Sequence, residues 1–366
     1  MPLQPLRIID ANLNRASEGL RFLEDVARFL LNDAALSQQL RGIRHNLAEG
    51  AKALHIKLLS HRDSEHDVGR PHTIPLPLEE GEMNVEAASP QALPGLITAN
   101  AKRAEESLRV IEELAKLPEM TSILDSAKFE LARFVLYTLE QELVSRILRQ
   151  DKVRRLTGLY VILDRQALAG RNELDIASQI IRGGARIIQF RDKQGSKGEL
   201  LPIAQKLKTL CSKSDVLFII NDYLDLALAV DADGLHIGQG DLPLPFIRRE
   251  LPIDKIVGCS VNTLAQALKA QNDRVDYISV GSIFPTTTKR EATVVGQDML
   301  KEVKQAVSCP VVAIGGINED NVGQAIAAGA DGIAVISAVL AGDDIRGSVQ
   351  RLIAKIDLAK EKCQSR

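Results

Sequence analysis

The sequence lacks the features that mark several classes of protein. Its apolar runs are well short of the ~20 residues that a membrane-spanning helix needs, and residues 1–15 contain no apolar core of the signal-peptide type. The formal net charge is only −2, which indicates no basic face for nucleic acid. The four cysteines form no CxxC pair, which favours reduced thiols. We therefore expect a cytoplasmic protein with no membrane or nucleic-acid partner.

The composition and length are those of a globular protein with more than one core. The chain has 366 residues, of which 45% are hydrophobic and 26% are charged. This length exceeds one small core and allows two domains. The residue pattern changes near the middle, and we predict a domain of residues 1–150 followed by a domain of residues 151–366.

Residues 1–150 predict an all-α domain. Leucine and alanine recur at helical spacing, and no run of β-branched residues suggests a strand. Residues 8–29 resemble residues 96–117, with the shared pattern A-N-x-x-R-A-x-E-x-L-R-x-x-E. A second helix is expected after each copy, near 36–59 and 121–149, so the pattern predicts two pseudo-repeated helical hairpins. A long polar loop is expected between them, at 60–95.

The shared residues of the repeat stand three apart, which places them along one ridge of each helix. They are Asn12, Arg15, Glu18, Arg21 and Glu24 in the first copy, and Asn100, Arg103, Glu106, Arg109 and Glu112 in the second. Three interpretations are open: structural ion pairs, a ligand site near a pseudo-two-fold axis, or an interface in a homo-oligomer.

Residues 151–366 alternate between short Val- and Ile-rich runs and amphipathic stretches. Eight strands are predicted, at 159–163, 186–190, 217–220, 234–237, 256–259, 276–280, 311–314 and 332–336. Eight such units predict an α/β fold, a (β/α)8 TIM barrel, whose active site lies at the carboxyl ends of the strands.

Charged and amide side chains follow the second, third and fourth predicted strands. Gln189, Arg191 and Lys193 alternate, so they leave the strand on one side. Two cations and an amide suit a polyphosphate and a polar ring. Asp222 and Asp241 come from neighbouring strand ends, where two carboxylates are unfavourable unless a cation lies between them. Mg²⁺ fits this pair best.

Phosphate-binding features follow the later strands. The segment 283–296 is a polar, Thr-rich loop containing Lys289, and Gly315, Gly316 and Ser337 form the usual phosphate site of barrels. His236 is expected to be a packed strand residue. The sequence shows no Cys–His pair and no Ser–His–Asp order. These residues indicate a reaction in which pyrophosphate leaves one substrate and the second substrate attacks.

Residues 156–358 resemble the thiamine phosphate synthase family. The matching motifs are QFRDK at 189–193, Asn221-Asp222, GLHIGQGD at 234–241, GCS at 258–260, P-T-x-T-K at 285–289, IGGI at 314–317 and VIS at 335–337. The resemblance implies that 4-amino-2-methyl-5-hydroxymethylpyrimidine diphosphate and thiazole phosphate give thiamine phosphate and pyrophosphate, with Mg²⁺ as cofactor.

The resemblance also implies residue roles. Gln189 and Tyr160 would hold the pyrimidine, and Asp222 and Asp241 would bind Mg²⁺. The pyrophosphate would be held by Arg191, Lys193, Asn221, Ser260 and Lys289, of which Arg191, Lys193 and Lys289 are the expected catalytic residues. The thiazole phosphate would be held by Thr286, Thr288, Gly316, Ile336 and Ser337.

The helical half resembles a domain that precedes some of these synthases and is linked to phosphorylation of hydroxymethylpyrimidine phosphate. This implies a bifunctional enzyme that uses ATP, with a site among Asn12, Arg15, Glu18, Arg21, Asn100, Arg103, Glu106 and Arg109. The sequence shows no P-loop. Two alternatives stay open: a non-catalytic assembly or regulatory module, and, for the barrel, a thiazole tautomerase.

Overall fold

The computed structural model describes residues 3–50, 52–60, 92–286 and 293–364. The chain divides into two units, Met1–Leu148 and Arg149–Arg366. The division falls inside helix α5 (Ser126–Arg154), as does the boundary predicted between residues 150 and 151. Of the loop predicted at 60–95, residues 61–91 lie outside the described residues, whereas residues 92–95 form the first turn of a helix, which corrects the prediction there. The predicted site residues Thr288 and Lys289 also lie outside the described residues.

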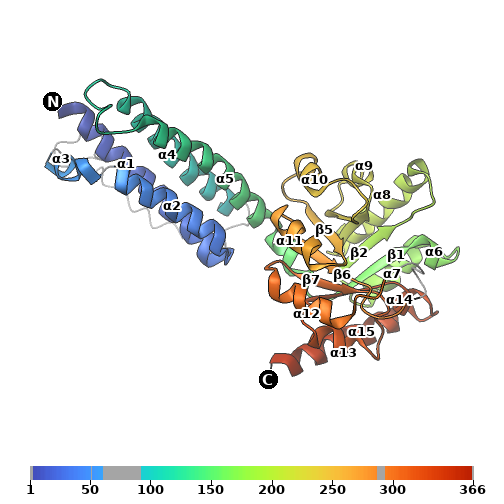
Figure 1. The fold of residues 1–366 in the computed structure, drawn as a ribbon. Coiled ribbons are helices and arrows are strands. Elements are labelled where there is room, and N and C mark those ends of the chain that lie inside the picture. The colour runs from blue at the N-terminus through green and yellow to red at the C-terminus, as the bar shows by residue number, and fades with distance from the viewer. Residues whose placement is uncertain (1–2, 51, 61–91, 287–292, 365–366) are drawn as a thin grey trace, which may run out of the picture. The chain divides into compact units, whose positions relative to one another are not determined.

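The described residues of the first unit form helices joined by turns and contain no strand (Figure 1). Its core is formed mainly by leucine, isoleucine and alanine from the inner faces of the helices. Helix α1 packs against both α2 and α4. The elements are α1 (Leu3–Asp25), the π-helix η1 (Val26–Leu30), α2 (Ala34–Gly50), the 3-10 helix η2 (Lys52–Leu54), α3 (His55–Ser60), α4 (Ala92–Ala115) and α5.

The predicted repeat has matching contacts in its two copies. Glu24 on α1 is buried and accepts hydrogen bonds from Arg44 on α2, with Nε and Nη2 at 3.2 and 3.0 Å from Oε2. Glu112 on α4 is also buried and accepts from Nε and Nη2 of Arg133 on α5 at 3.3 and 3.0 Å. The last glutamate of each ridge therefore joins the two helices of its own hairpin, which supports structural pairing for this position.

Helices α1 and α4 approach closely at Gly19. A Cβ atom there would lie 2.7 Å from the carbonyl oxygen of Asn100 and 3.3 Å from Cβ of Ala104. The corresponding residue of the second copy is Ser107. The close approach of the two helices explains why α1 has glycine at position 19.

The second unit is a closed barrel of eight parallel strands in sequential order, which confirms the predicted fold. Each predicted strand is present, with its ends within two residues of the prediction. The strands are β1 (Leu159–Asp164), β2 (Ile187–Arg191), β3 (Leu217–Asn221), β4 (Gly234–Ile237), β5 (Ile256–Val261), β6 (Tyr277–Val280), β7 (Val311–Ile314) and β8 (Gly332–Val335).

Helices surround the strands (Figure 1), and a large apolar core lies between the two layers. The helices are α6 (Arg165–Leu168), α7 (Glu173–Arg182), α8 (Lys197–Lys213), α9 (Leu224–Ala229), α10 (Leu244–Glu250), α11 (Leu264–Asn272), α12 (Gly296–Ala306), α13 (Val322–Ala327), α14 (Ser337–Leu340) and α15 (Ile345–Gln364).

A separate, smaller core fills the inside of the barrel. Tyr160 on β1 and Tyr277 on β6 belong to it, and both are at most 2% exposed. Gly258 on β5 makes room for Tyr277, because a Cβ atom at Gly258 would lie 2.0 Å from the ring. The inner core thus combines aliphatic residues with two tyrosine hydroxyls, which need partners when buried.

The amino end of the barrel is joined to the last turn of α5 and the residues after it by ion pairs. Arg149 Nε lies 3.0 Å from Asp276, and Lys152 Nζ lies 3.1 Å from Asp254. Leu156 and Val153 pack against the inner core. These contacts place the last residues of α5 with the barrel unit.

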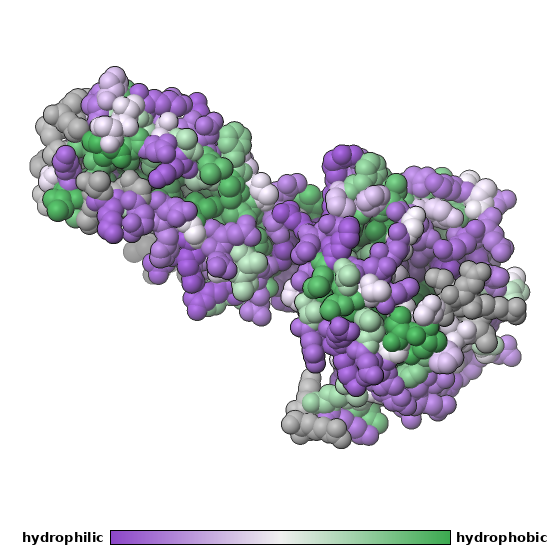
Figure 2. Space-filling view, in the orientation of Figure 1, coloured by the Kyte–Doolittle hydropathy of each residue, from purple (hydrophilic) through white to green (hydrophobic). Residues whose placement is uncertain are grey.

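Hydrophilic residues dominate the face of the molecule seen in Figure 2, and hydrophobic residues form separate patches on both units. Among the described residues, no helix is both long and apolar enough to cross a membrane. All four cysteines are free.

We predict that Glu112→Gln lowers the free energy of unfolding of the helical unit by about 1–3 kcal/mol, because buried charge-assisted hydrogen bonds lose their acceptor charge. The matched control is Glu113→Gln, since the Glu113 side chain is 49% exposed and its ion pairs are at the surface. The control should change the free energy by less than about 0.5 kcal/mol. Denaturant unfolding followed by helical circular dichroism measures both, and equal effects would contradict the prediction.

The same variant has a pH signature. Burial would raise the pKa of Glu112, but hydrogen bonds from Lys116 and Arg133 outweigh it, so the pKa lies below the ordinary value of 4.5. A carboxyl with a lowered pKa stabilises the folded state above its unfolded pKa, and this contribution is lost as the pH falls through the folded pKa. Below about pH 4.5, the difference between wild type and Glu112→Gln should therefore shrink.

Candidate active site

A cavity of about 530 Å³ opens at the carboxyl ends of the barrel strands. Each of the eight strands contributes at least one residue to its wall, and the residue from β1 is Ile162. Most of the site residues predicted for the barrel meet here. The lining includes Gln189, Arg191, Lys193, Asn221, Asp222, Asp241, Ser260, Thr286, Gly316, Ile336 and Ser337.

The cations of the cavity come from β2 and the loop after it, and carboxylates hold them. Arg191 forms an ion pair with Asp164, the last residue of β1, whose other oxygen accepts from the backbone of Ala167 and caps α6. Lys193 Nζ lies 3.4 Å from Asp222. Both positive groups therefore face the cavity in defined positions.

The loop that holds Lys193 is fixed by Asp192. Its carboxylate accepts from the backbone nitrogens of Gln194 and Gly195, at 2.7 and 2.9 Å, and from Arg165 at 2.6 Å. Burial would raise the pKa of Asp192, but these hydrogen bonds outweigh it and the pKa is lowered. A charged Asp192 thus keeps the loop ordered at neutral pH.

Two carboxylates, Asp222 and Asp241, face each other at the cavity. The backbone of Asp222 has φ 64°, and its N–H donates to the carbonyl oxygen of His236 at 2.8 Å, which ties the end of β3 to β4. Asp241 accepts from the backbone nitrogen of Gly238 at 2.7 Å. Burial raises the pKa of Asp222, and the neighbouring Asp241 raises it further. The pair is electrostatically unfavourable as two bare anions.

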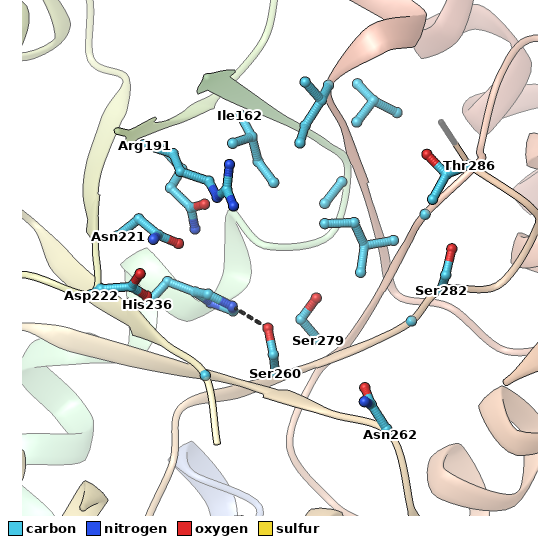
Figure 3. A pocket seen from close by; sticks show the side chains of 18 of the residues that line it. Ile162, Arg191, Asn221, Asp222, His236, Ser260, Asn262, Ser279, Ser282 and Thr286 are labelled. Atoms are coloured by element: carbon cyan, nitrogen blue, oxygen red, sulfur yellow. Dashed lines mark hydrogen bonds between the residues drawn. The ribbon is translucent and has the colours of Figure 1, made fainter. Parts of the chain in front are cut away.

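Gln189 and Ser260 present polar atoms to the cavity from deeper positions. Gln189 is 2% exposed, and its Nε2 donates to the hydroxyl of Tyr160 at 2.9 Å. Ser260 Oγ lies 2.9 Å from Nε2 of His236 (Figure 3). Tyr160 itself lies behind Gln189 in the barrel interior and does not line the cavity. Tyr160 was expected to hold the pyrimidine, but its buried position favours contact with Gln189 instead.

The wall on the side of β6 to β8 is built differently (Figure 3). Arg191, Asn221 and Asp222 lie on one side of the cavity, and Ser282 and Thr286 lie on the other. The second side also includes the backbone of Gly315 and Gly316 and the start of α14 at Ser337. The cavity therefore has one side with charged groups and one with hydroxyls and backbone.

Gly316 is required by close packing as well as by conformation. Its φ is 67°, and a Cβ atom would lie 2.4 Å from the carbonyl oxygen of Pro285. The Gly pair thus sets the position of the segment that carries Thr286.

Several lining residues were not identified from the sequence. Ser279 and Asn262 were missed, and His236 was expected only to pack. Asp164 was missed as well; it does not line the cavity but holds Arg191. His236 is 8% exposed and packed, yet it also lines the cavity. Burial lowers its pKa to about 4, so the ring is neutral. Two features of the sequence could have identified them: Asp164 is the last residue of β1, and Ser279 lies at an inward-facing position of β6.

The ridge residues of the helical unit have other surroundings. Asn12 and Asn100 each donate to the carbonyl oxygen four residues earlier, at 2.8 Å. Apart from the buried Glu24 and Glu112, the charged ridge residues are exposed: Arg15, Glu18, Arg21, Arg103, Glu106 and Arg109. Arg109 pairs with Glu112 and Glu113. Ligand binding by this ridge stays a prediction.

Two family models match different parts of the chain. The model described as "Thiamine monophosphate synthase" matches residues 159–339, and the model described as "ThiD2 family" matches residues 7–142. The first match covers the strands and most of the helices of the barrel, and the second covers most of the helical unit.

Similar proteins occur at two lengths. A thiamine-phosphate synthase of Thermosynechococcus vestitus is 35% identical over 352 residues, which are 96% of this chain and 94% of that one. A thiamine-phosphate synthase of Methanospirillum hungatei is 46% identical over 195 residues, or 53% of this chain and 95% of that one. The solved thiamine phosphate pyrophosphorylase of Pyrococcus furiosus has a TM-score of 0.53 and 38% identity, and covers 57% of this chain and 98% of that one.

Proposed function

Because the chain belongs to the thiamine-phosphate synthase family, we propose that its cavity binds 4-amino-2-methyl-5-hydroxymethylpyrimidine diphosphate together with thiazole phosphate. The products are thiamine phosphate and pyrophosphate. As a member of this family, the chain is a transferase of thiamine biosynthesis. The observation that best supports the substrate assignment is the cavity itself, with cations and carboxylates on one side and hydroxyls and glycine backbone on the other.

The charged side suits the diphosphate. Arg191, Lys193, Asn221 and Ser260 supply positive charge and hydrogen-bond donors for pyrophosphate oxygens. Lys289, outside the described residues, is proposed to join them. Donors that are already fixed, as Arg191 is by Asp164, stabilise a departing anion without reorganisation.

Asp222 and Asp241 are proposed to hold Mg²⁺. The pair fits this ion, because burial and mutual repulsion raise the pKa of Asp222 and a cation would relieve both effects. Among the described residues, no group of three or more His, Cys, Asp or Glu side chains could hold a metal. Two carboxylates suit Mg²⁺, which is often bound by one or two carboxylates with substrate phosphates and water. The ion would add positive charge beside the departing pyrophosphate.

The reaction we propose needs no protein nucleophile. The C–O bond between the pyrimidine methylene and the diphosphate breaks, and its electron pair leaves with pyrophosphate. The lone pair of the thiazole nitrogen then forms the new C–N bond to the methylene carbon. The chain's residues bind and orient the two substrates and stabilise the leaving anion, which are positioning and electrostatic contributions.

The hydroxyl and backbone side suits the monophosphate of the thiazole. Thr286, Gly316, Ile336 and Ser337 line it, and Thr288, outside the described residues, is proposed to contribute. A thiazole tautomerase is the rival function for such a barrel. It would not need the pyrophosphate-binding groups, so the presence of Arg191 and the carboxylate pair in the cavity favours the synthase.

The helical unit is proposed to phosphorylate hydroxymethylpyrimidine phosphate with ATP, and so to make the substrate of the barrel. The match to the ThiD2 family supports a role in the same pathway. Arg15 and Arg103 are exposed, where they could contact phosphate groups. A non-catalytic assembly or regulatory module, including one that forms a homo-oligomer, is the alternative. A cytoplasmic location stays a prediction.

We predict that Asp222→Asn lowers turnover by on the order of 10² with saturating substrates and Mg²⁺. Without Mg²⁺, the variant should bind inorganic pyrophosphate at least as tightly as wild type, because one repelling charge is gone. Asp298→Asn is the control, since the Asp298 side chain is fully exposed on α12. Steady-state kinetics and calorimetry measure the two quantities. Wild-type turnover in Asp222→Asn would refute the proposed metal site.

Gly316→Ala should raise KM for thiazole phosphate by about tenfold or more, which corresponds to ~1.4 kcal/mol, because the added Cβ displaces the segment before Thr286. The affinity for inorganic pyrophosphate should stay within about twofold of wild type. Gly342→Ala is the matched control, since a Cβ atom there meets no atom within 4 Å. If the affinities for thiazole phosphate and for inorganic pyrophosphate fell by the same factor, the result would argue against two separate subsites.

The helical unit is tested with the full chain, given pyrimidine monophosphate, thiazole phosphate, ATP and Mg²⁺. We expect thiamine phosphate to form without an added kinase. An ATP analogue that cannot transfer its terminal phosphate should abolish this route, while the route from pyrimidine diphosphate continues. If only the diphosphate is used, the module interpretation holds and the kinase proposal is wrong.

A further inference from the structure

A chain of hydrogen bonds runs through the barrel interior and links two parts of the cavity wall. It connects side chains of β1, β2, β4, β5 and β6. The members, in order, are Gln189, Tyr160, Tyr277, His236 and Ser260, with successive distances of 2.9, 3.0, 3.0 and 2.9 Å. Gln189 and Ser260, at its two ends, both line the cavity.

The direction of the hydrogen bonds follows from the donor at one end. Gln189 Nε2 donates to Tyr160. Either hydroxyl could donate between Tyr160 and Tyr277, and the buried Tyr160 proton keeps a partner only if it goes to the Tyr277 oxygen. The Tyr277 proton then goes to Nδ1 of His236. A neutral imidazole that accepts at Nδ1 has its proton on Nε2, and this proton goes to Ser260. The Ser260 proton is thereby left for the cavity.

Packing fixes the middle of this chain. Tyr277 lies against Gly258, where no side chain could be accommodated. Its ring centroid is 6.1 Å from that of Tyr160 and 5.5 Å from that of His236. None of the three rings can turn away without disturbing the inner core, so a buried polar network of this kind holds one set of orientations.

We propose that Tyr277 and His236 are positioning residues, which couple the pyrimidine end of the cavity to its pyrophosphate end. The inference rests on the proposed function, because that function assigns Gln189 to the pyrimidine and Ser260 to the pyrophosphate. Neither Tyr277 nor His236 needs to touch a substrate to act in this way.

Both ends then match their ligands. Since Nε2 of Gln189 is used inside the barrel, its Oε1 remains for the cavity, where it accepts from the exocyclic amino group of an aminopyrimidine. Since Ser260 accepts from His236, its hydroxyl donates to an anion such as pyrophosphate. The opposite direction of the chain would offer an amide N–H to the amino group and a serine without a free proton to the anion.

A thermodynamic cycle tests this coupling. The variants are Gln189→Met, which cannot donate to Tyr160, and Tyr277→Phe, which removes the hydroxyl in the middle of the chain. The measured quantity is the Kd of inorganic pyrophosphate with Mg²⁺, determined by calorimetry on the full chain. Pyrophosphate has no pyrimidine ring, and methionine has no charge, so Gln189→Met should act on it only through the chain.

Gln189→Met alone should weaken pyrophosphate binding roughly three- to tenfold, the size expected for one net hydrogen bond. In the Tyr277→Phe background, the same substitution should change the Kd by less than about twofold, because the connection is already broken. The same loss in both backgrounds, or no loss in wild type, would overturn the proposal. Pyrophosphate that fails to bind wild type, or wild type that forms no thiamine phosphate, would instead refute the proposed function.

Nitrogen NMR of His236 gives a second readout that a purely structural role would not change. The wild type should show the tautomer protonated at Nε2, with the signal assigned by its loss in His236→Gln. Tyr277→Phe should produce a mixture of tautomers, whereas the control Tyr223→Phe, a tyrosine outside the cavity lining, should not. An unchanged Nε2 tautomer in Tyr277→Phe would contradict the proposed direction of the chain.

Discussion

The unfavourable proximity of Asp222 and Asp241 is the constraint around which the barrel site is organised. The backbone of Asp222 is held in the left-handed region, and Asp241 is fixed by the N–H of Gly238, so neither carboxylate can easily move away. Burial makes two bare anions costly at this place. We expect the electrostatic repulsion between the two carboxylates to be relieved when a cation and an anionic substrate bind together.

The charges around this pair form a second layer. Carboxylates hold the cations: Asp164 orients Arg191, and Asp192 fixes the loop that carries Lys193. Beneath them, the chain of hydrogen bonds orders uncharged donors and acceptors. The cavity thus combines the charges of its bound ligands with dipoles that the protein holds in fixed positions. This arrangement suits a reaction whose main event is the departure of an anion.

The strand ends could be predicted from the sequence because their signal is local. Period-two alternation and the position after each strand were enough to bring Arg191, Asp222 and Asp241 to one rim. Contacts across the barrel could not be predicted, since they depend on which side chains meet in three dimensions. Tyr160 was therefore expected at a substrate, although it lies one layer below, and its partner Tyr277 was not singled out at all. In the helical unit the repeat was visible, but the burial that makes Glu24 and Glu112 structural was not.

The central claim is that a divalent cation and the pyrophosphate share the charged side of the cavity. A crystal of the full chain grown with Mn²⁺ and inorganic pyrophosphate tests it directly, since Mn²⁺ is located by its anomalous scattering. The ion should lie within coordinating distance of both Asp222 and Asp241, with pyrophosphate oxygens beside Arg191 and Lys193. An ion that contacts neither carboxylate, or pyrophosphate bound instead beside Thr286 and Ser337, would contradict the account.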